Sequence, residues 1–174
     1  MKVKIAPKTT VSGLLKLMLM LLALCLSGYV STASIAEGEP KIVPALSAVA
    51  SGLHASKAPV FLPSYLPTWN YKLYGSAELG EFEYGQGYEA TVATEPGTPC
   101  NANTLFYLSG GQGPVVPPKG SNQVDLGEGR IGYYFGGGNF HTLDWSIGKN
   151  AYRIASYQPQ SELVKIAKSM VAVK

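Results

Sequence analysis

The stretch from 143 to 170, LDWSIGKNAYRIASYQPQSELVKIAKSM, combines three local patterns that together indicate how this chain folds. Apolar and polar residues alternate over 143–147, which is the period of a strand with one buried face. The residues at 148–150, Gly-Lys-Asn, tolerate positive φ, so the chain can reverse there. Alternation resumes over 151–157. The stretch therefore predicts two antiparallel strands joined by a tight turn.

Beyond Pro159 the hydrophobic period changes to that of a helix. From Ser161 onward, apolar residues recur at positions i, i+3, i+4 and i+7, a single stripe on one face of a short helix: Leu163, Ile166, Ala167 and Met170. We expect this stripe to pack on the buried face of the preceding strands, against residues such as Trp145 and Ile154.

Turn residues recur at intervals of about 8–12 residues between 69 and 157, as in antiparallel sheets. The fold class is therefore predicted as α+β: a meandering antiparallel sheet, curved as in a half-barrel, with a short N-terminal helix and a C-terminal helix packed on one face. Tight turns are expected at 85–87 and 127–129, and flexible connections at 109–120 and 136–139. The expected strands are Trp69–Tyr74, Glu81–Tyr84, Tyr88–Thr94, Leu105–Leu108, Gln123–Leu126, Gly129–Phe135, Thr142–Ile147 and Ala151–Tyr157.

Residues 1–36 have the layout of a secretory signal peptide. Four lysines precede an uncharged apolar run over 17–26, and small residues follow it, with cleavage expected after Ala33 or Ala36. An uncleaved anchor is the alternative, although ten apolar residues fall short of the roughly 20 that span a bilayer. The sequence LALC ending at Cys25 also resembles a lipoprotein box, but the bulky Leu24 stands where a small residue is usual. The predicted location is secreted or periplasmic; the alternative is membrane anchorage through the N-terminal segment.

Removal of the signal peptide changes the charge of the chain. The full sequence has 14 Lys and Arg against 11 Asp and Glu, a net charge of +3. Four of the lysines lie before residue 37, so ten basic residues then face eleven acidic ones, a net charge of −1. No basic cluster remains, which argues against a nucleic-acid partner. A membrane contact is expected only through an uncleaved N-terminal segment or through a lipid on Cys25.

The mature part divides into a polar lead-in with a short helix, 37–57, and a single α+β domain, 58–174. Pro44 suits the first turn of that helix. Three prolines punctuate 58–67, which excludes a helix there. This segment is either an exposed polyproline ligand or an extended strand packed on the domain. The apolar residues between the prolines favour packing, with Val60, Phe61, Leu62 and Leu66 as the contacts.

Several short motifs occur in a fixed order: PVFLPSYLP (59–67), Gly87-Tyr88-Glu89, Pro99-Cys100, Gly132-Tyr133-Tyr134-Phe135, Leu143-Asp144-Trp145, Tyr152-Arg153-Ile154 and ELVKIAKS (162–169). In this order they resemble a group of uncharacterised exported bacterial proteins, many of them cyanobacterial. The C-terminal motifs also resemble a domain of unknown function in bacterial envelope and sporulation proteins, which is thought to be similar to the half-barrel of outer-membrane lipoprotein carriers. The resemblance implies an envelope location and brings no catalytic residues. Cysteines that would form a family disulfide with Cys100 are absent here.

Candidate catalytic and metal-binding residues are few. His141 and Asp144 lie three apart, so in a strand they point to opposite faces and do not form a pair. His54 lies far from them in the sequence. Cys100 could act as a nucleophile with His141, be a packing residue, or form an intermolecular disulfide. The acidic residues Glu78, Glu81, Glu83 and Glu89 lack a calcium-loop pattern. We therefore expect no catalytic residues, no metal and no cofactor.

Aromatic residues offer the remaining functional signal. On a curved sheet, seven of them could line a groove for a lipid, glycan or peptide; alternatively they are divided between core and surface. The predicted function is thus a non-catalytic envelope module for an apolar ligand or partner. The alternatives are a Cys- or His-dependent hydrolase of envelope polymers and an interaction domain that uses 58–67 or 109–120. The seven candidates are Trp69, Tyr71, Tyr74, Tyr84, Tyr88, Tyr133 and Tyr134.

Overall fold

The two strands after residue 140 pair as their alternation predicts. In the computed structural model, which describes residues 41–96, 103–138 and 140–173, β7 (His141–Ile147) and β8 (Asn150–Ser156) are antiparallel neighbours. A two-residue turn joins them, and Gly148 adopts a φ of 60°. Positive φ at the first turn residue is typical of a type II′ hairpin turn, which suits the right-handed twist of the strands.

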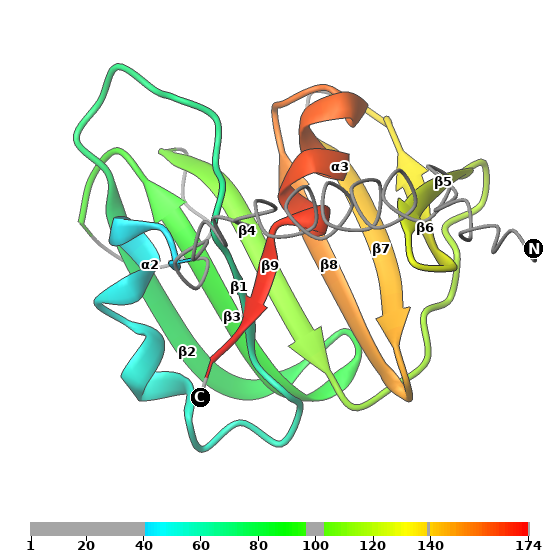
Figure 1. The fold of residues 1–174 in the computed structure, drawn as a ribbon, viewed down its shortest axis with the longest axis horizontal. Coiled ribbons are helices and arrows are strands. Elements are labelled where there is room, and N and C mark those ends of the chain that lie inside the picture. The colour runs from blue at the N-terminus through cyan, green and yellow to red at the C-terminus, as the bar shows by residue number, and fades with distance from the viewer. Residues whose placement is uncertain (1–40, 97–102, 139, 174) are drawn as a thin grey trace, which may run out of the picture. The chain divides into compact units, whose positions relative to one another are not determined.

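Seven strands form one open antiparallel sheet (Figure 1), in the order β2-β3-β4-β8-β7-β6-β5. Two meanders, β2 to β4 and β5 to β8, join where β4 pairs with β8. The predicted α+β class is therefore confirmed. The remaining strands of this sheet are β2 (Tyr74–Phe82), β3 (Gly85–Ala93), β4 (Thr104–Gly111), β5 (Asn122–Gly127) and β6 (Arg130–Phe135).

Short elements from both ends of the described chain cover one face of this sheet, which we call the inner face (Figure 1). The chain first forms α2 (Pro44–Ser47) and a 3-10 helix, η1 (Ala50–Leu53), with Pro44 in the first turn as expected. It ends with α3 (Gln160–Lys168). Between them, β1 (Phe61–Pro63) pairs with β9 (Met170–Ala172) in a separate two-stranded sheet. Within the described residues, no helix is long and apolar enough to cross a membrane.

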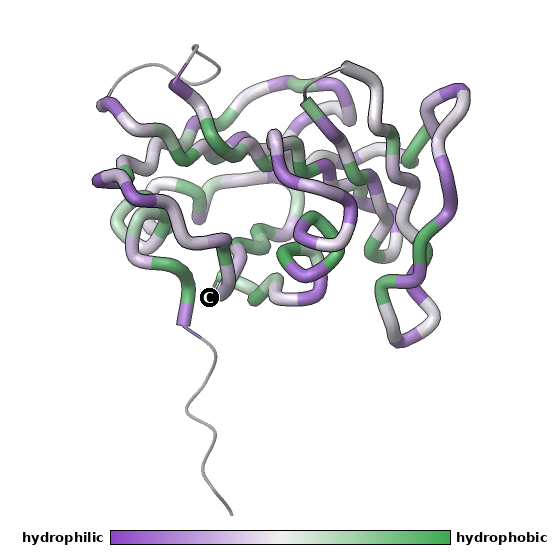
Figure 2. Tube along the Cα trace, turned by 90° about the horizontal axis from the view of Figure 1, so that it is seen from above, coloured by the Kyte–Doolittle hydropathy of each residue, from purple (hydrophilic) through white to green (hydrophobic). Residues whose placement is uncertain are grey.

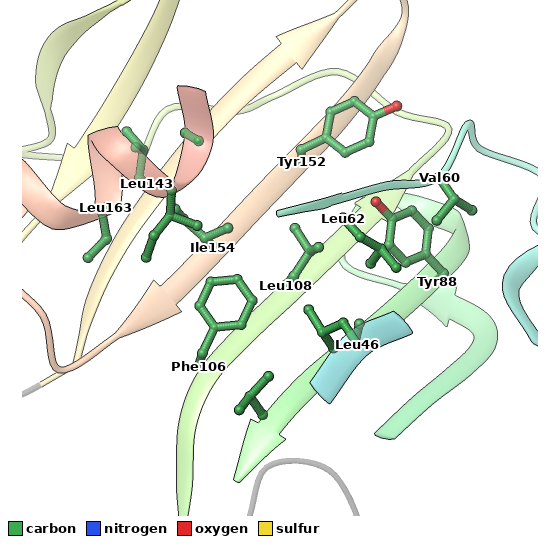
Figure 3. Close-up of a cluster of buried hydrophobic side chains, with 14 of the residues drawn as sticks. Leu46, Val60, Leu62, Tyr88, Phe106, Leu108, Leu143, Tyr152, Ile154 and Leu163 are labelled. Atoms are coloured by element: carbon green, nitrogen blue, oxygen red, sulfur yellow. The ribbon is translucent and has the colours of Figure 1, made fainter. Parts of the chain in front are cut away.

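The inner face is a filled hydrophobic core and not an open groove (Figure 3). Phe106, Leu108 and Ile154 of the sheet are fully buried beneath Leu62 of β1 and Leu163 of α3. The predicted helix stripe is confirmed at its three buried positions. Along much of the chain, hydrophobic and hydrophilic residues alternate (Figure 2), which is why a single face of the sheet can supply this core.

Tyrosine hydroxyl groups anchor the proline-rich segment to the core. The Tyr88 hydroxyl accepts a hydrogen bond from the Phe61 N–H at 3.0 Å and donates one to the Phe61 carbonyl at 2.8 Å. The Tyr152 hydroxyl donates to the Pro59 carbonyl at 3.1 Å, while the Phe61 ring packs edge-on against the Tyr152 ring. The prediction that 58–67 is extended and packed on the domain is therefore confirmed.

Some predicted boundaries in the first half of the sheet are wrong. The strand expected over Trp69–Tyr74 does not form, because β2 only begins at Tyr74. The strand expected over Glu81–Tyr84 is split, since β2 ends at Phe82 and the chain turns before Gly85, whose φ is 85°. The turn thus precedes the expected position at 85–87. The expected turn at 127–129 is confirmed, with positive φ at all three of its residues.

Two further corrections have a packing cause. The loop expected from Ser109 begins only after Gly111, because β4 continues through both glycines. A Cβ atom at Gly110 would lie 2.5 Å from the Tyr88 ring, so only glycine leaves room for the tyrosines of the neighbouring strands. Met170, expected on the helix, instead begins β9 and pairs with Pro63.

Candidate functional site

The face of the sheet opposite the core, which we call the outer face, carries polar and aromatic side chains. Alternation along the strands places Tyr107, Arg153 and Asp144 there, since their neighbours Phe106, Ile154 and Leu143 point into the core. The helices and the β1–β9 pair of the described residues all lie on the inner face (Figure 1). The outer face is therefore the surface on which a binding site can be sought.

Arg153 organises the centre of the outer face through ion pairs. Asp144 lies opposite it on β7 and receives two hydrogen bonds, from Nε at 2.7 Å and from Nη2 at 2.8 Å. Nη1 bonds Glu83, whose side chain is more exposed, and the guanidinium lies 5.4 Å from the centroid of the Tyr84 ring. Since the Asp144 side chain is fully buried, removing either partner of this bidentate pair would leave an uncompensated charge and cost more than breaking an ordinary surface pair.

The ion pairs also affect the protonation of their neighbours. Hydrogen bonding to Asp144 raises the pKa of Arg153 further above its ordinary value, so the guanidinium stays charged. Burial, with the nearby charge of Asp144, raises the pKa of Tyr84. Tyr84 is therefore a neutral phenol under physiological conditions.

A third carboxylate, Glu89, lies two strands away from Arg153 in the sheet. The Tyr107 hydroxyl on β4 donates a hydrogen bond to Glu89 on β3, and Glu78 is the cross-strand neighbour of Glu89 on β2. Burial raises the pKa of Glu89, an effect that the bond from Tyr107 partly opposes. Carboxylates thus extend along the outer face from β2 to β7, with Arg153 between them.

Next to these charges the outer face contains a pocket of about 390 Å³. Its floor consists of small side chains, including Ala155, which is only 4% exposed. Its rim consists of Tyr107, Phe140 and Tyr157, and the Phe140 and Tyr157 rings pack edge to face with centroids 4.8 Å apart. The volume lies within the usual range for small-ligand sites. The complete set of described lining residues is Thr104, Tyr107, Phe140, Thr142, Arg153, Ala155 and Tyr157.

A larger hollow, of about 1060 Å³, lies between α2, η1 and β9. Lys41, where the described chain begins, is among its lining residues. The pocket on the outer face is the better-defined site, because the secondary structure beneath it is regular.

The seven aromatic residues predicted as a groove do not come together. Tyr88 is fully buried in the core, and Trp69 and Tyr134 pack against that core. Tyr71 is 64% exposed, and Tyr74 lines a different pocket beside α2. Tyr84 and Tyr133 lie on the outer face, where both flank the Arg153–Asp144 pair, whereas Tyr74 lies on the edge strand β2. The expected concave groove instead corresponds to the filled core.

The other candidate residues are also separated. His141 Nδ1 lies 2.9 Å from the Gln158 carbonyl, and its ring packs against Tyr134, whereas Asp144 pairs with Arg153 on the opposite face. The expected separation of this pair is therefore confirmed. His54 follows η1, remote from His141 in the fold. The residues described by the structure contain no cluster of metal-ligating side chains. Cys25, Cys100 and the predicted signal peptide lie outside the described residues.

The pocket residues were missed because they come from separate stretches of sequence. Thr104 and Tyr107 belong to β4, Phe140 directly precedes β7, and Thr142 lies at the start of β7. Arg153 and Ala155 belong to β8, and Tyr157 directly follows it. Strand alternation alone could have placed Tyr107 and Arg153 on one face. Their proximity required the β4–β8 pairing. No protein-family profile, curated protein or solved structure matches this chain.

Proposed function

We propose that this protein is an exported, envelope-associated binding module without catalytic activity, and that the pocket on the outer face holds an apolar group of a ligand or of an envelope protein. One observation carries the proposal. Three aromatic side chains rim a floor of small residues on the face of the sheet that the described helices leave uncovered.

The physical argument rests on what the rim gains from a bound group. Tyr157 is 53% exposed although it packs against Phe140, so two aromatic rings present apolar surface to water. A bound group that covers this surface gains about 25 cal/mol of favourable free energy for each Å² of apolar surface that it removes from water. A floor of Ala155 and Thr142 lets a bound group approach the sheet closely, and regular β-strands hold these two residues and Tyr107 of the rim.

The pattern of hydrogen bonds favours binding over the alternative of a hydrolase. Both carboxylate oxygens of Asp144 accept hydrogen bonds from Arg153, and His141 Nδ1 lies against a backbone carbonyl on the inner side of β7, so neither supports the other as an acid–base pair. Two further features support an envelope module: the signal-like residues 1–36, and an open antiparallel sheet with a helix on one face, as the resemblance to lipoprotein carriers implies.

A pocket-filling substitution tests this proposal. The neutral fluorescent probe N-phenyl-1-naphthylamine is expected to brighten on binding the protein. Ala155→Leu places a larger side chain on the pocket floor and should lower that affinity at least several-fold. Ala55→Leu makes the same chemical change in the exposed turn that follows η1 and should leave the affinity unchanged. Circular dichroism confirms that both variants fold. Equal probe binding by all three proteins would overturn the proposal.

A further inference from the structure

The pocket on the outer face is lined by aromatic rings and bordered by an excess of negative charge. We propose that it selects an organic cation, such as a quaternary ammonium or alkylammonium group. This inference rests on the proposed function, because it names the class of ligand for the same pocket.

The aromatic rim suits a cation with an apolar surface. The face of an aromatic ring carries the negative part of its quadrupole, so it attracts an ammonium group within about 6 Å of its centroid. Tyr107, Phe140 and Tyr157 supply three rings around one space. An alkylated ammonium loses little hydration on entering such a site, since its methyl groups already separate its charge from water. It therefore gains both the burial of its methyl groups and the ring attraction.

The charges beside the pocket have the complementary sign. Each of three carboxylates contacts a lining residue: Glu89 through the Tyr107 hydroxyl, and Asp144 and Glu83 through Arg153. Glu78 stands across from Glu89 on β2. Arg153 is the one cationic side chain among the described lining residues. Four carboxylates against one guanidinium create a negative potential that attracts a cation and disfavours an anion.

Arg153 does not reverse this preference. Its Nε, Nη1 and Nη2 atoms each donate to a carboxylate oxygen, so its charge is neutralised by groups of the protein itself. An anionic ligand would have to compete with the buried Asp144 for those donors, which would leave a buried carboxylate without its partner. The partial burial of Glu89 strengthens the case, because a carboxylate that has lost hydration interacts more strongly with a nearby cation.

Two probes of the same shape separate charge from hydrophobicity. Choline and 3,3-dimethyl-1-butanol differ in the replacement of a quaternary nitrogen by carbon. Chemical-shift titration of the pocket residues by NMR measures the affinity of each. We expect choline to bind about 2- to 30-fold more tightly, as a cation–π advantage of roughly 0.5–2 kcal/mol implies. The Glu89→Gln variant should reduce this ratio. The matched Glu128→Gln variant, at an exposed turn between β5 and β6, should not.

The outcomes distinguish this inference from the proposal on which it rests. Equal affinities, or tighter binding of the neutral alcohol, would overturn the selection of a cation and leave the pocket as an apolar binding site. If the pocket resonances respond to none of the three compounds, choline, the alcohol and N-phenyl-1-naphthylamine, both the selection of a cation and the proposed binding site are refuted. An unchanged affinity ratio in Glu89→Gln would show that the carboxylates have no part in selection and would also overturn the inference.

Discussion

Arg153 and Asp144 form the polar centre of the sheet. Asp144 is fully buried, and 17% of the Arg153 side chain is exposed to solvent. The hydrogen bonds between the two side chains must therefore compensate for the hydration that both have lost. The sequence placed Asp144 beside His141, three residues away. Because side chains alternate along a strand, His141 and Asp144 lie on opposite faces of β7. Asp144 instead pairs with Arg153, which lies nine positions later, across the β7–β8 hairpin.

Asp144→Asn should strongly destabilise the protein, because the guanidinium of Arg153 would keep its charge and lose its buried counter-charge. We expect the free energy of unfolding to fall by about 3 kcal/mol, the lower end of the range for a broken buried pair, since Arg153 retains some solvent contact. Urea denaturation followed by circular dichroism measures this change.

The matched control is Glu83→Gln, which removes the more exposed carboxylate of the same cluster. That loss should cost less than about 1 kcal/mol. Similar losses for both variants would show that burial does not set the strength of these pairs.

Individual elements differ in how far local sequence determines them. The β7–β8 hairpin and α3 were predictable because their hydrophobic periods and turn residues lie within a few positions of one another. β4 was cut short in the prediction because Gly110 and Gly111 suggest a loop, whereas here Gly110 accommodates tyrosine rings from neighbouring strands and Gly111 lies against the backbone of Tyr84. β9 was missed because three residues after a helix show no pattern of their own, and only pairing with β1 makes them a strand.

Ile166→Ala tests how much α3 depends on the sheet. Ile166 is completely buried between the helix and the sheet, and truncation would leave a cavity. We expect a loss of about 2–5 kcal/mol in the free energy of unfolding, measured by urea denaturation. Lys168→Ala, on the exposed side of the same helix, should change it by less than about 0.5 kcal/mol. A small effect of Ile166→Ala would contradict the packing of α3 described above.

For the molecule as a whole, the decisive contacts are those between distant segments. The β4–β8 pairing brings the two meanders into one sheet and assembles the pocket from three stretches of chain. Alternation predicted which residues share a face, but not the order of the strands, since many orders satisfy the same pattern. The fold class was therefore predictable from sequence, whereas the site was not.

The β1–β9 pair connects segments from near both ends of the described chain, and its register allows a stringent test. Val173 donates to the Val60 carbonyl and Ser64 to the Ser169 carbonyl. Hydrogen-bonded pairs alternate along an antiparallel ladder, so the pair between these two, Leu62 and Val171, is hydrogen-bonded. Val171→Pro removes a donor from that pair and leaves a carbonyl unsatisfied beside the core, at a cost of about 1–3 kcal/mol.

Ala172→Pro is the control for this substitution. Ala172 belongs to the non-bonded pair with Phe61, so its N–H contributes nothing to the ladder, and proline is tolerated at such positions of an edge strand. The free energy of unfolding should then fall by less than about 1 kcal/mol for Ala172→Pro, and hydrogen exchange of the Val173 and Ser64 amides should accelerate mainly in Val171→Pro. The opposite ranking of the two variants would mean that β1 and β9 pair in a register shifted by one residue.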